Sequence, residues 1–145
     1  MQVQNTNFSQ TLTMSKQVFI LEEDKDDWSL VRETLLELDM DIPLHFFTNS
    51  DDMFHALATG IKPDLVLVDY NSSPDNGPEV VRKLKTDPGC REIPVVVLSD
   101  SDLPLYRNLS YAAGASSFIK KPDTVTGTRK KIQTFFSYWF EVVEI

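Results

Sequence analysis

The sequence has 145 residues, which is the length of one globular domain. It contains 14 Lys and Arg against 22 Asp and Glu, a formal net charge of −8, and 41% of its residues are hydrophobic. This composition excludes a disordered or fibrous chain, and the acidic balance argues against nucleic-acid binding, which needs a basic face. The one cysteine excludes an internal disulfide and a cysteine-based zinc site.

The sequence predicts a flexible tail over residues 1–15 and one folded domain over residues 16–145. The tail is rich in Asn, Thr, Gln and Ser and has few apolar side chains to bury. It also lacks the apolar stretch of a secretory signal, and no apolar run in the chain is long enough to span a bilayer. We therefore expect a cytoplasmic protein without membrane contact.

Five short apolar segments alternate with five segments of helical periodicity. Apolar residues that follow one another without alternation indicate strands covered on both faces. The predicted strands are 18–21, 43–48, 65–68, 94–98 and 116–120. The predicted helices begin near Asp26 or Asp27, Asn49, Glu79, Leu105 and Thr124, and they run to Leu38, Gly60, Thr86, Gly114 and Val143.

This order of elements predicts an α/β fold with a doubly wound, five-stranded parallel sheet. Buried strands joined by helices pair in parallel through right-handed crossovers. In such sheets, functional sites form beyond the carboxyl ends of the strands, where the strand order reverses. The residues that follow each predicted strand are therefore the first place to look for chemistry.

Acids, a hydroxyl and an amine follow four of the predicted strands. They are residues 22–24 (Glu-Glu-Asp), Asp69, Ser99 and Lys121. Because clustered carboxylates repel one another, they need a cation, and either Mg²⁺ or the Lys121 ammonium would serve. Asp69 would then be a nucleophile that attacks phosphorus to give an acyl phosphate, with the metal and Lys121 neutralising the phosphoryl oxygens. Ser99 would donate a hydrogen bond to one of those oxygens.

Each of these residues alone also has an ordinary structural interpretation. An acid after a strand is commonly a turn or helix-cap residue, and a lysine is commonly exposed. Their placement at successive strand ends is what predicts a site.

Four stretches, VFILEEDKDD, PDLVLVDY, PVVVLSDS and GASSFIKKP, resemble the receiver domain of bacterial two-component response regulators. The resemblance extends from about Lys16 to Ile145. It implies the (βα)5 flavodoxin-like receiver fold, in the stand-alone, single-domain type of regulator. It also implies a signalling protein that phosphorylates itself on an aspartate and is not a turnover enzyme.

The resemblance assigns a metal site to the acidic residues. Glu22 and Glu23 would hold Mg²⁺ together with Asp69 and the backbone carbonyl of Asn71. The residue pair Glu23 and Asp24 is an alternative register for the acidic pair.

The resemblance also implies the parts of a phosphorylation switch. Asp69 corresponds to the phosphoacceptor, Ser99 to the hydroxyl that turns toward the phosphate, and Phe118 to an aromatic residue that changes rotamer. Lys121 corresponds to the lysine that pairs with the phosphate, and the bond before Pro122 is expected to be cis.

These roles imply a phosphorelay. A histidine kinase or phosphotransfer protein would supply the phosphoryl group, and the face formed by the fourth helix, fifth strand and fifth helix would change for an unknown output protein. A homodimer through an ordinary-looking face is an open alternative. Residues 103–106 and 129–131 are candidate contacts on this face, with solvated surface as the simpler interpretation.

Three positions depart from the family pattern. Glu23 stands where Asp is commoner, residues 72–73 are Ser-Ser with Pro74 one residue late, and Asp100 stands where a small residue is usual. These departures leave a pseudo-receiver, a protein-binding module that works without phosphate, as the alternative function. A phosphatase that uses a similar strand-end aspartate is disfavoured, because Asn71 and Ser73 replace the second Asp and the Thr of its motif.

Overall fold

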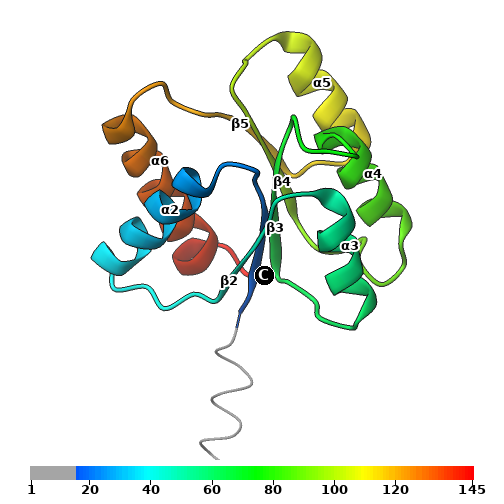
Figure 1. Cartoon of the computed structure of the whole chain (residues 1–145), viewed down its shortest axis with the longest axis horizontal. Coiled ribbons are helices and arrows are strands. Elements are labelled where there is room, and N and C mark those ends of the chain that lie inside the picture. Colours follow the sequence, from blue (N-terminus) through cyan, green and yellow to red (C-terminus); the bar gives the residue numbers. More distant parts are fainter. Residues whose placement is uncertain (1–15) are drawn as a thin grey trace, which may run out of the picture.

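The computed structural model describes residues 16–145, so the tail predicted at residues 1–15 lies outside the described residues. Over this part the chain forms one parallel sheet with the strand order β2-β1-β3-β4-β5 (Figure 1). The α/β fold with a five-stranded parallel sheet is thereby confirmed. The strands are β1 (Val18–Leu21), β2 (Leu44–Phe47), β3 (Leu65–Asp69), β4 (Val95–Ser99) and β5 (Ser117–Lys120).

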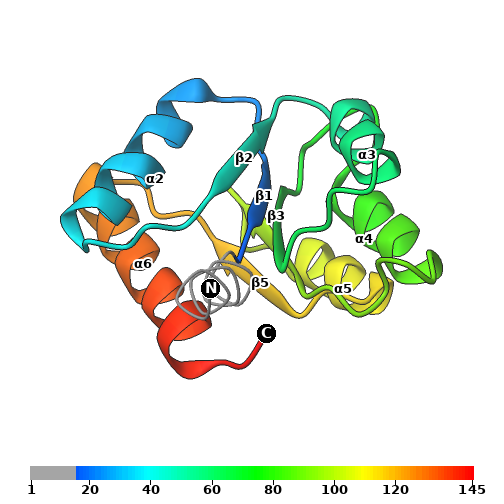
Figure 2. The same cartoon turned by 90° about the horizontal axis from the view of Figure 1, so that it is seen from below.

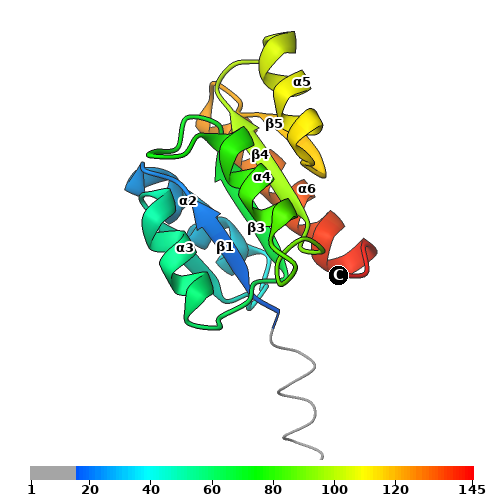
Figure 3. The same ribbon diagram turned by 90° about the vertical axis from the view of Figure 1, so that its right-hand side faces the viewer.

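Helices cover both faces of the sheet. On one side of the sheet lie α2 (Lys25–Glu37) and α6 (Val125–Ser137) (Figure 2). Across the other face lie α3 (Ser50–Ala58), α4 (Gly77–Thr86) and α5 (Pro104–Ala113) (Figure 3).

The central strands are apolar on both faces because each face packs against a helical layer. Side chains along a strand point alternately to opposite faces. Phe19 and Val66 belong to the core cluster that includes residues of α3, α4 and α5, whereas Ile20 and Leu67 belong to the cluster that includes residues of α2 and α6. This two-sided burial explains the continuous apolar runs in the sequence.

Two helices begin earlier than the sequence predicts. Asp24 caps α2, in place of Asp26 or Asp27, because its carboxylate accepts a hydrogen bond from the Asp26 N–H at 2.9 Å. In α4, the Asn76 side chain accepts from the Glu79 N–H and the Glu79 side chain accepts from the Asn76 N–H, each at 3.0 Å. This capping box starts the helix at Gly77, two residues before the predicted start.

The last helix also differs from its prediction. The α-helix ends at Ser137, and the segment η1 (Tyr138–Val142) continues it as a π-helix. The Val143 N–H donates to the Tyr138 carbonyl at 2.9 Å, which is the five-residue spacing of a π-turn. The α-helix and the wider turn each contribute a buried side chain, Phe136 and Trp139, to one core cluster.

Across residues 16–145, we find no helix whose length and apolar character would let it cross a membrane.

Leucine-to-alanine changes at two helical positions test the packing. Leu84 in α4 is fully buried, whereas Leu36 in α2 is 78% exposed. Leu84→Ala should lower the free energy of unfolding by about 2–5 kcal/mol, because it leaves a cavity in the core. The control Leu36→Ala should change it by less than about 0.5 kcal/mol. Urea unfolding followed by circular dichroism measures both, and equal losses would contradict the packing described here.

Candidate functional site

The residues predicted to carry chemistry lie beyond the carboxyl ends of neighbouring strands. The chain runs from β1 outward to β2 and then returns to β3, so β1 and β3 are adjacent at the point where the strand order reverses. Leu21 of β1 pairs with Val68 of β3, which puts Glu22 beside Asp69 at the sheet edge. Lys121 follows β5, and its backbone N–H donates to the Ser99 carbonyl at 2.7 Å.

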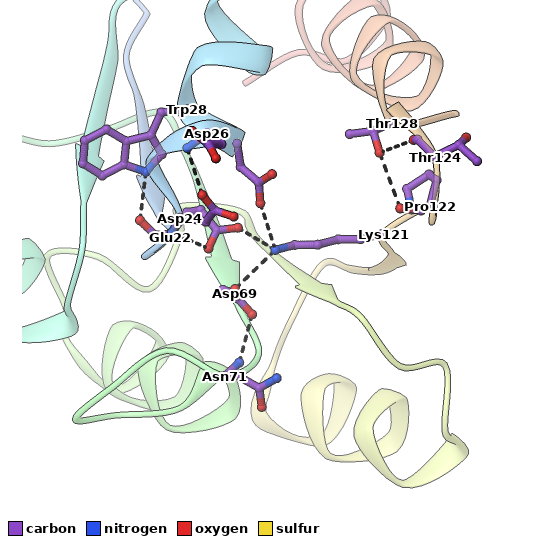
Figure 4. Close-up of polar contacts among 11 residues, drawn as sticks. Glu22, Asp24, Asp26, Trp28, Asp69, Asn71, Lys121, Pro122, Thr124 and Thr128 are labelled. Carbon is purple, nitrogen blue, oxygen red and sulfur yellow. Dashed lines mark hydrogen bonds and ion pairs between the residues drawn. The ribbon is translucent and has the colours of Figure 1, made fainter. Parts of the chain in front are cut away.

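The side chain of Lys121 crosses this edge to three carboxylates (Figure 4). Its ammonium nitrogen lies 2.5 Å from Glu22 Oε1, 3.3 Å from Asp69 Oδ2 and 3.7 Å from Asp27 Oδ2. These four residues are called the Lys121 cluster below. Three of them were predicted as site residues, and the structure brings those three together.

Three members of the Lys121 cluster, Glu22, Asp69 and Lys121, are largely shielded from water, whereas Asp27 is 45% exposed. The Glu22 side chain is 8% exposed, and burial raises its pKa to about 7 against the opposing effect of Lys121. Burial alone would lower the pKa of Lys121, but the hydrogen bond to Glu22 and the charges of Asp69 and Glu22 outweigh it and raise the pKa above its ordinary value. The amine therefore stays a cation at neutral pH.

The two carboxylate oxygens of Asp69 have different partners. Oδ1 accepts a hydrogen bond from the Asn71 N–H at 3.0 Å, and Oδ2 faces the Lys121 ammonium. The Asp69 side chain is 14% exposed, so most of it is shielded from solvent. Asp69 is thus held in one orientation with an oxygen directed at a cation.

The loop after Asp69, which holds the Ser72-Ser73 departure, is tied to α3. Ser50 lies fully buried in the first turn of α3, and its hydroxyl accepts from the Asp75 N–H at 3.0 Å. The Ser50 N–H donates to the Ser73 carbonyl at 2.9 Å, and the Ser72 hydroxyl donates to the Asp75 carbonyl at 2.7 Å. The hydroxyls of Ser50 and Ser72 and the backbone carbonyl of Ser73 therefore hold this loop in place through hydrogen bonds.

Ser99 and Phe118 lie next to the Lys121 cluster but are engaged elsewhere. The Ser99 side chain is buried at the end of β4, and its hydroxyl donates to the Ser101 carbonyl at 2.8 Å. Phe118 in β5 is half-buried and packs against the core beneath α3, α4 and α5. Its N–H donates to the Tyr111 hydroxyl at 3.2 Å. Their predicted movements stay predictions.

The predicted metal ligands are only partly gathered. Within residues 16–145, no three His, Cys, Asp or Glu side chains are arranged as a metal-binding group. Glu22 and Asp69 converge, but Glu23 is exposed at the rim. Asp24 is engaged in capping α2, which favours Glu22 and Glu23 over the alternative register. The metal ligand set therefore stays a prediction.

The expectation of a cis bond before Pro122 is wrong. The cis peptide bond among residues 16–145 is Ser73–Pro74. Trans is the favoured isomer of an X–Pro bond, and Lys121 reaches Glu22 and Asp69 without the cis form.

Sequence reasoning missed Asp27 as a member of the Lys121 cluster. It lies in the first turn of α2, directly after the β1 strand end. The available signal was its position: the amino end of the helix that follows a site-bearing strand lies over the same sheet edge.

A cleft of about 900 Å³ opens beside the cluster. The cleft is lined by acidic side chains, including Glu23 and Asp100, and by apolar side chains such as Trp28 of α2 and Phe135 of α6. Trp28 stacks on Phe46 with ring centroids 4.9 Å apart, and its indole N–H donates to the Glu22 carbonyl at 2.8 Å. Trp28 therefore lies directly beside Glu22, one of the acidic residues that line the cleft.

Comparison with protein families decides the family of this chain. The model of the response regulator receiver domain matches residues 18–133. The chain belongs to this family. The match covers all five strands and α6 as far as residue 133, and it includes every member of the Lys121 cluster.

Individual relatives of this receiver domain agree with the family match. It is 28% identical to response regulator Rcp1 of Synechocystis sp. over 139 residues, which is 90% of this chain and 92% of Rcp1. The crystal structure of the Mn²⁺-bound form of Rcp1 superposes with a TM-score of 0.83 at 27% identity, covering 90% of this chain and 98% of the other. The phosphorylated cyanobacterial phytochrome response regulator RcpA gives a TM-score of 0.83 at 26% identity, covering 90% and 97%.

Lys120 and Lys121 should differ in how much each contributes to the free energy of unfolding of this receiver domain. Lys121→Met leaves Glu22, Asp27 and Asp69 without their ammonium, and this should lower the free energy of unfolding at neutral pH by about 1–3 kcal/mol. The control Lys120→Met removes an ammonium that lies 3.7 Å from the 91% exposed Asp123. That change should cost less than about 0.5 kcal/mol. Urea unfolding in the presence of a chelator measures both, and similar values for the two variants would argue against the cluster.

Proposed function

We propose that this receiver domain is a phosphorylation switch in which Asp69 accepts a phosphoryl group from the phosphohistidine of a histidine kinase or phosphotransfer protein. The observation that carries the proposal is the arrangement of Asp69, with Oδ1 held by the Asn71 N–H and Oδ2 directed at the Lys121 ammonium. In the transfer, the bond between phosphorus and the imidazole nitrogen breaks and a bond between phosphorus and an Asp69 oxygen forms. The imidazole leaves with the electron pair and takes up a proton.

The donor atoms at this edge fit a hard divalent cation. Carboxylate oxygens of Glu22, Glu23 and Asp69 and the backbone carbonyl of Asn71 are the kind of ligands that Mg²⁺ takes, with water completing its shell. Burial of the Glu22 carboxylate beside Asp69 makes an additional cation favourable there, because one ammonium faces three carboxylates. When bound, Mg²⁺ would supply positive charge to the oxygens of the transferring phosphoryl group.

The protein's own residues perform the rest of the reaction. The Asn71 N–H keeps Asp69 oriented, and Lys121 offsets the charge that the phosphoryl oxygens bring. Ser99 then exchanges the Ser101 carbonyl for a phosphoryl oxygen, and Phe118 moves toward the space that Ser99 leaves. The phosphate favours this second packing only through the contacts that differ between the two states.

The consequence of the switch is a changed face over α5, β5 and α6, which an output protein or a second copy of the chain would bind. Phosphotransfer from a kinase places this function in the cytoplasm, with no nucleic-acid or membrane partner. Self-phosphorylation is stoichiometric, so turnover of a simple phosphomonoester is not expected.

Acetyl phosphate with Mg²⁺ tests the phosphoacceptor. We expect the mass of the protein to rise by one phosphoryl group, and Asp69→Asn should abolish the gain. The control Asp100→Asn removes an exposed carboxylate at the same rim and should leave the gain intact. If the parent protein gains no mass on Asp69, the phosphorylation-independent pseudo-receiver becomes the better description.

Tryptophan fluorescence tests the metal. The chain has two tryptophans, so Trp139→Phe leaves Trp28 as the sole reporter beside Glu22. In this background, Mg²⁺ should change the Trp28 emission in a saturable way, and Asp69→Asn should weaken binding about tenfold or more, because a charged ligand is lost. Ca²⁺ and Mn²⁺ titrations measure selectivity. A flat emission up to millimolar Mg²⁺, checked by calorimetry, would remove the metal from the proposal.

A further inference from the structure

Lys121 has more anionic partners than the proposed reaction uses. Glu22 and Asp69 are both proposed metal ligands, and both contact the Lys121 ammonium in the absence of metal, at 2.5 and 3.3 Å. Asp27, at 3.7 Å, is outside the proposed ligand set. The Lys121 cluster therefore contains one carboxylate that a metal ion would leave available to the amine.

Mg²⁺ and the ammonium would compete for the same two carboxylates, Glu22 and Asp69. To bind the cation, Glu22 and Asp69 must give up part of their interaction with Lys121, in a region where the Lys121 side chain is 19% exposed. A charge that loses its partners in such surroundings costs free energy unless another anion or water takes their place. The free-energy cost of metal binding therefore depends on whether Asp27 stays close to the Lys121 ammonium.

Asp27 is well placed to be that anion. The Asp24 cap and the first turn of α2 fix its backbone, since its N–H donates to the Asp24 carbonyl at 3.2 Å. A carboxylate in the first turn is also favoured by the helix dipole. Its side chain is 45% exposed, so water solvates the Asp27 carboxylate far more than that of Glu22, which is 8% exposed.

We propose that Asp27 is a positioning residue that retains the Lys121 ammonium when Glu22 and Asp69 bind a divalent cation. The proposal rests on the metal site proposed above and adds a role for a residue outside it. Asp27 thereby lowers the cost of metal binding and keeps the amine close to the oxygen that receives the phosphoryl group.

Mg²⁺ titrations followed by Trp28 emission in the Trp139→Phe background test this role. Asp27→Asn should raise the Kd for Mg²⁺ by about threefold, the size expected for a half-exposed ion pair. Asp27→Glu should restore most of the affinity. The matched control is Asp26→Asn, which removes the same charge from the same helical turn, where Asp26 is exposed and its N–H contacts Asp24. This control should change Kd by less than half as much.

A double-mutant cycle separates positioning from general electrostatics. In a Lys121→Met background, Asp27→Asn should no longer weaken Mg²⁺ binding, because the amine that it retains is gone. Equal weakening with and without Lys121, or equal effects of Asp26→Asn and Asp27→Asn, would overturn the role of Asp27. An absent response in the Trp139→Phe parent would instead overturn the metal site itself. Circular dichroism of each variant without Mg²⁺ confirms that the compared proteins are folded.

Discussion

The ion pairs of one amine with three carboxylates form the interaction on which the site depends. Glu22, Asp27 and Asp69 come from two strand ends and a helix start, and Lys121 joins them across the sheet edge. A nearly buried carboxylate such as Glu22 is unfavourable without a counter-charge, so Lys121 compensates it in the metal-free protein. In the proposed function, the excess negative charge of the cluster favours a second cation, and that cation together with Lys121 would offset the charge of a phosphoryl group.

The surrounding structure divides into fixed and exchangeable contacts. Asp69 is held by its own loop, and that loop is joined to α3 through Ser50, which is fully buried. The Ser99 hydroxyl makes two hydrogen bonds within a tight turn, donating to the Ser101 carbonyl and accepting from the Ser101 N–H, and Phe118 is only half-buried. The switch proposed above requires a firmly held aspartate beside side chains that can repack, so that a small change at Asp69 shifts which packing is preferred.

The departures from the family pattern have specific structural consequences. In the loop after Asp69, the Ser72 hydroxyl donates to the Asp75 carbonyl and the Ser73 carbonyl accepts from the Ser50 N–H, so the loop is hydrogen-bonded both within itself and to α3. Asp100 is exposed at the rim of the cleft, where water screens its charge. Glu23 is also exposed, and its longer side chain has the freedom to turn toward a metal ion.

The sequence by itself determined the five strands and the α/β class, because continuous apolar runs are a local signal of buried strands. It also determined the convergence of Glu22, Asp69 and Lys121, because parallel pairing brings the residues at strand ends to one edge of the sheet. It did not determine the Asp24 cap, the π-turn after Ser137, the trans bond before Pro122 or the part of Asp27 in the cluster. These features depend on contacts between segments or on competition between nearby acids of the same type. Only the tertiary structure decided them, because which of several carboxylates meets an amine depends on distances of a few ångströms that no spacing along the chain encodes.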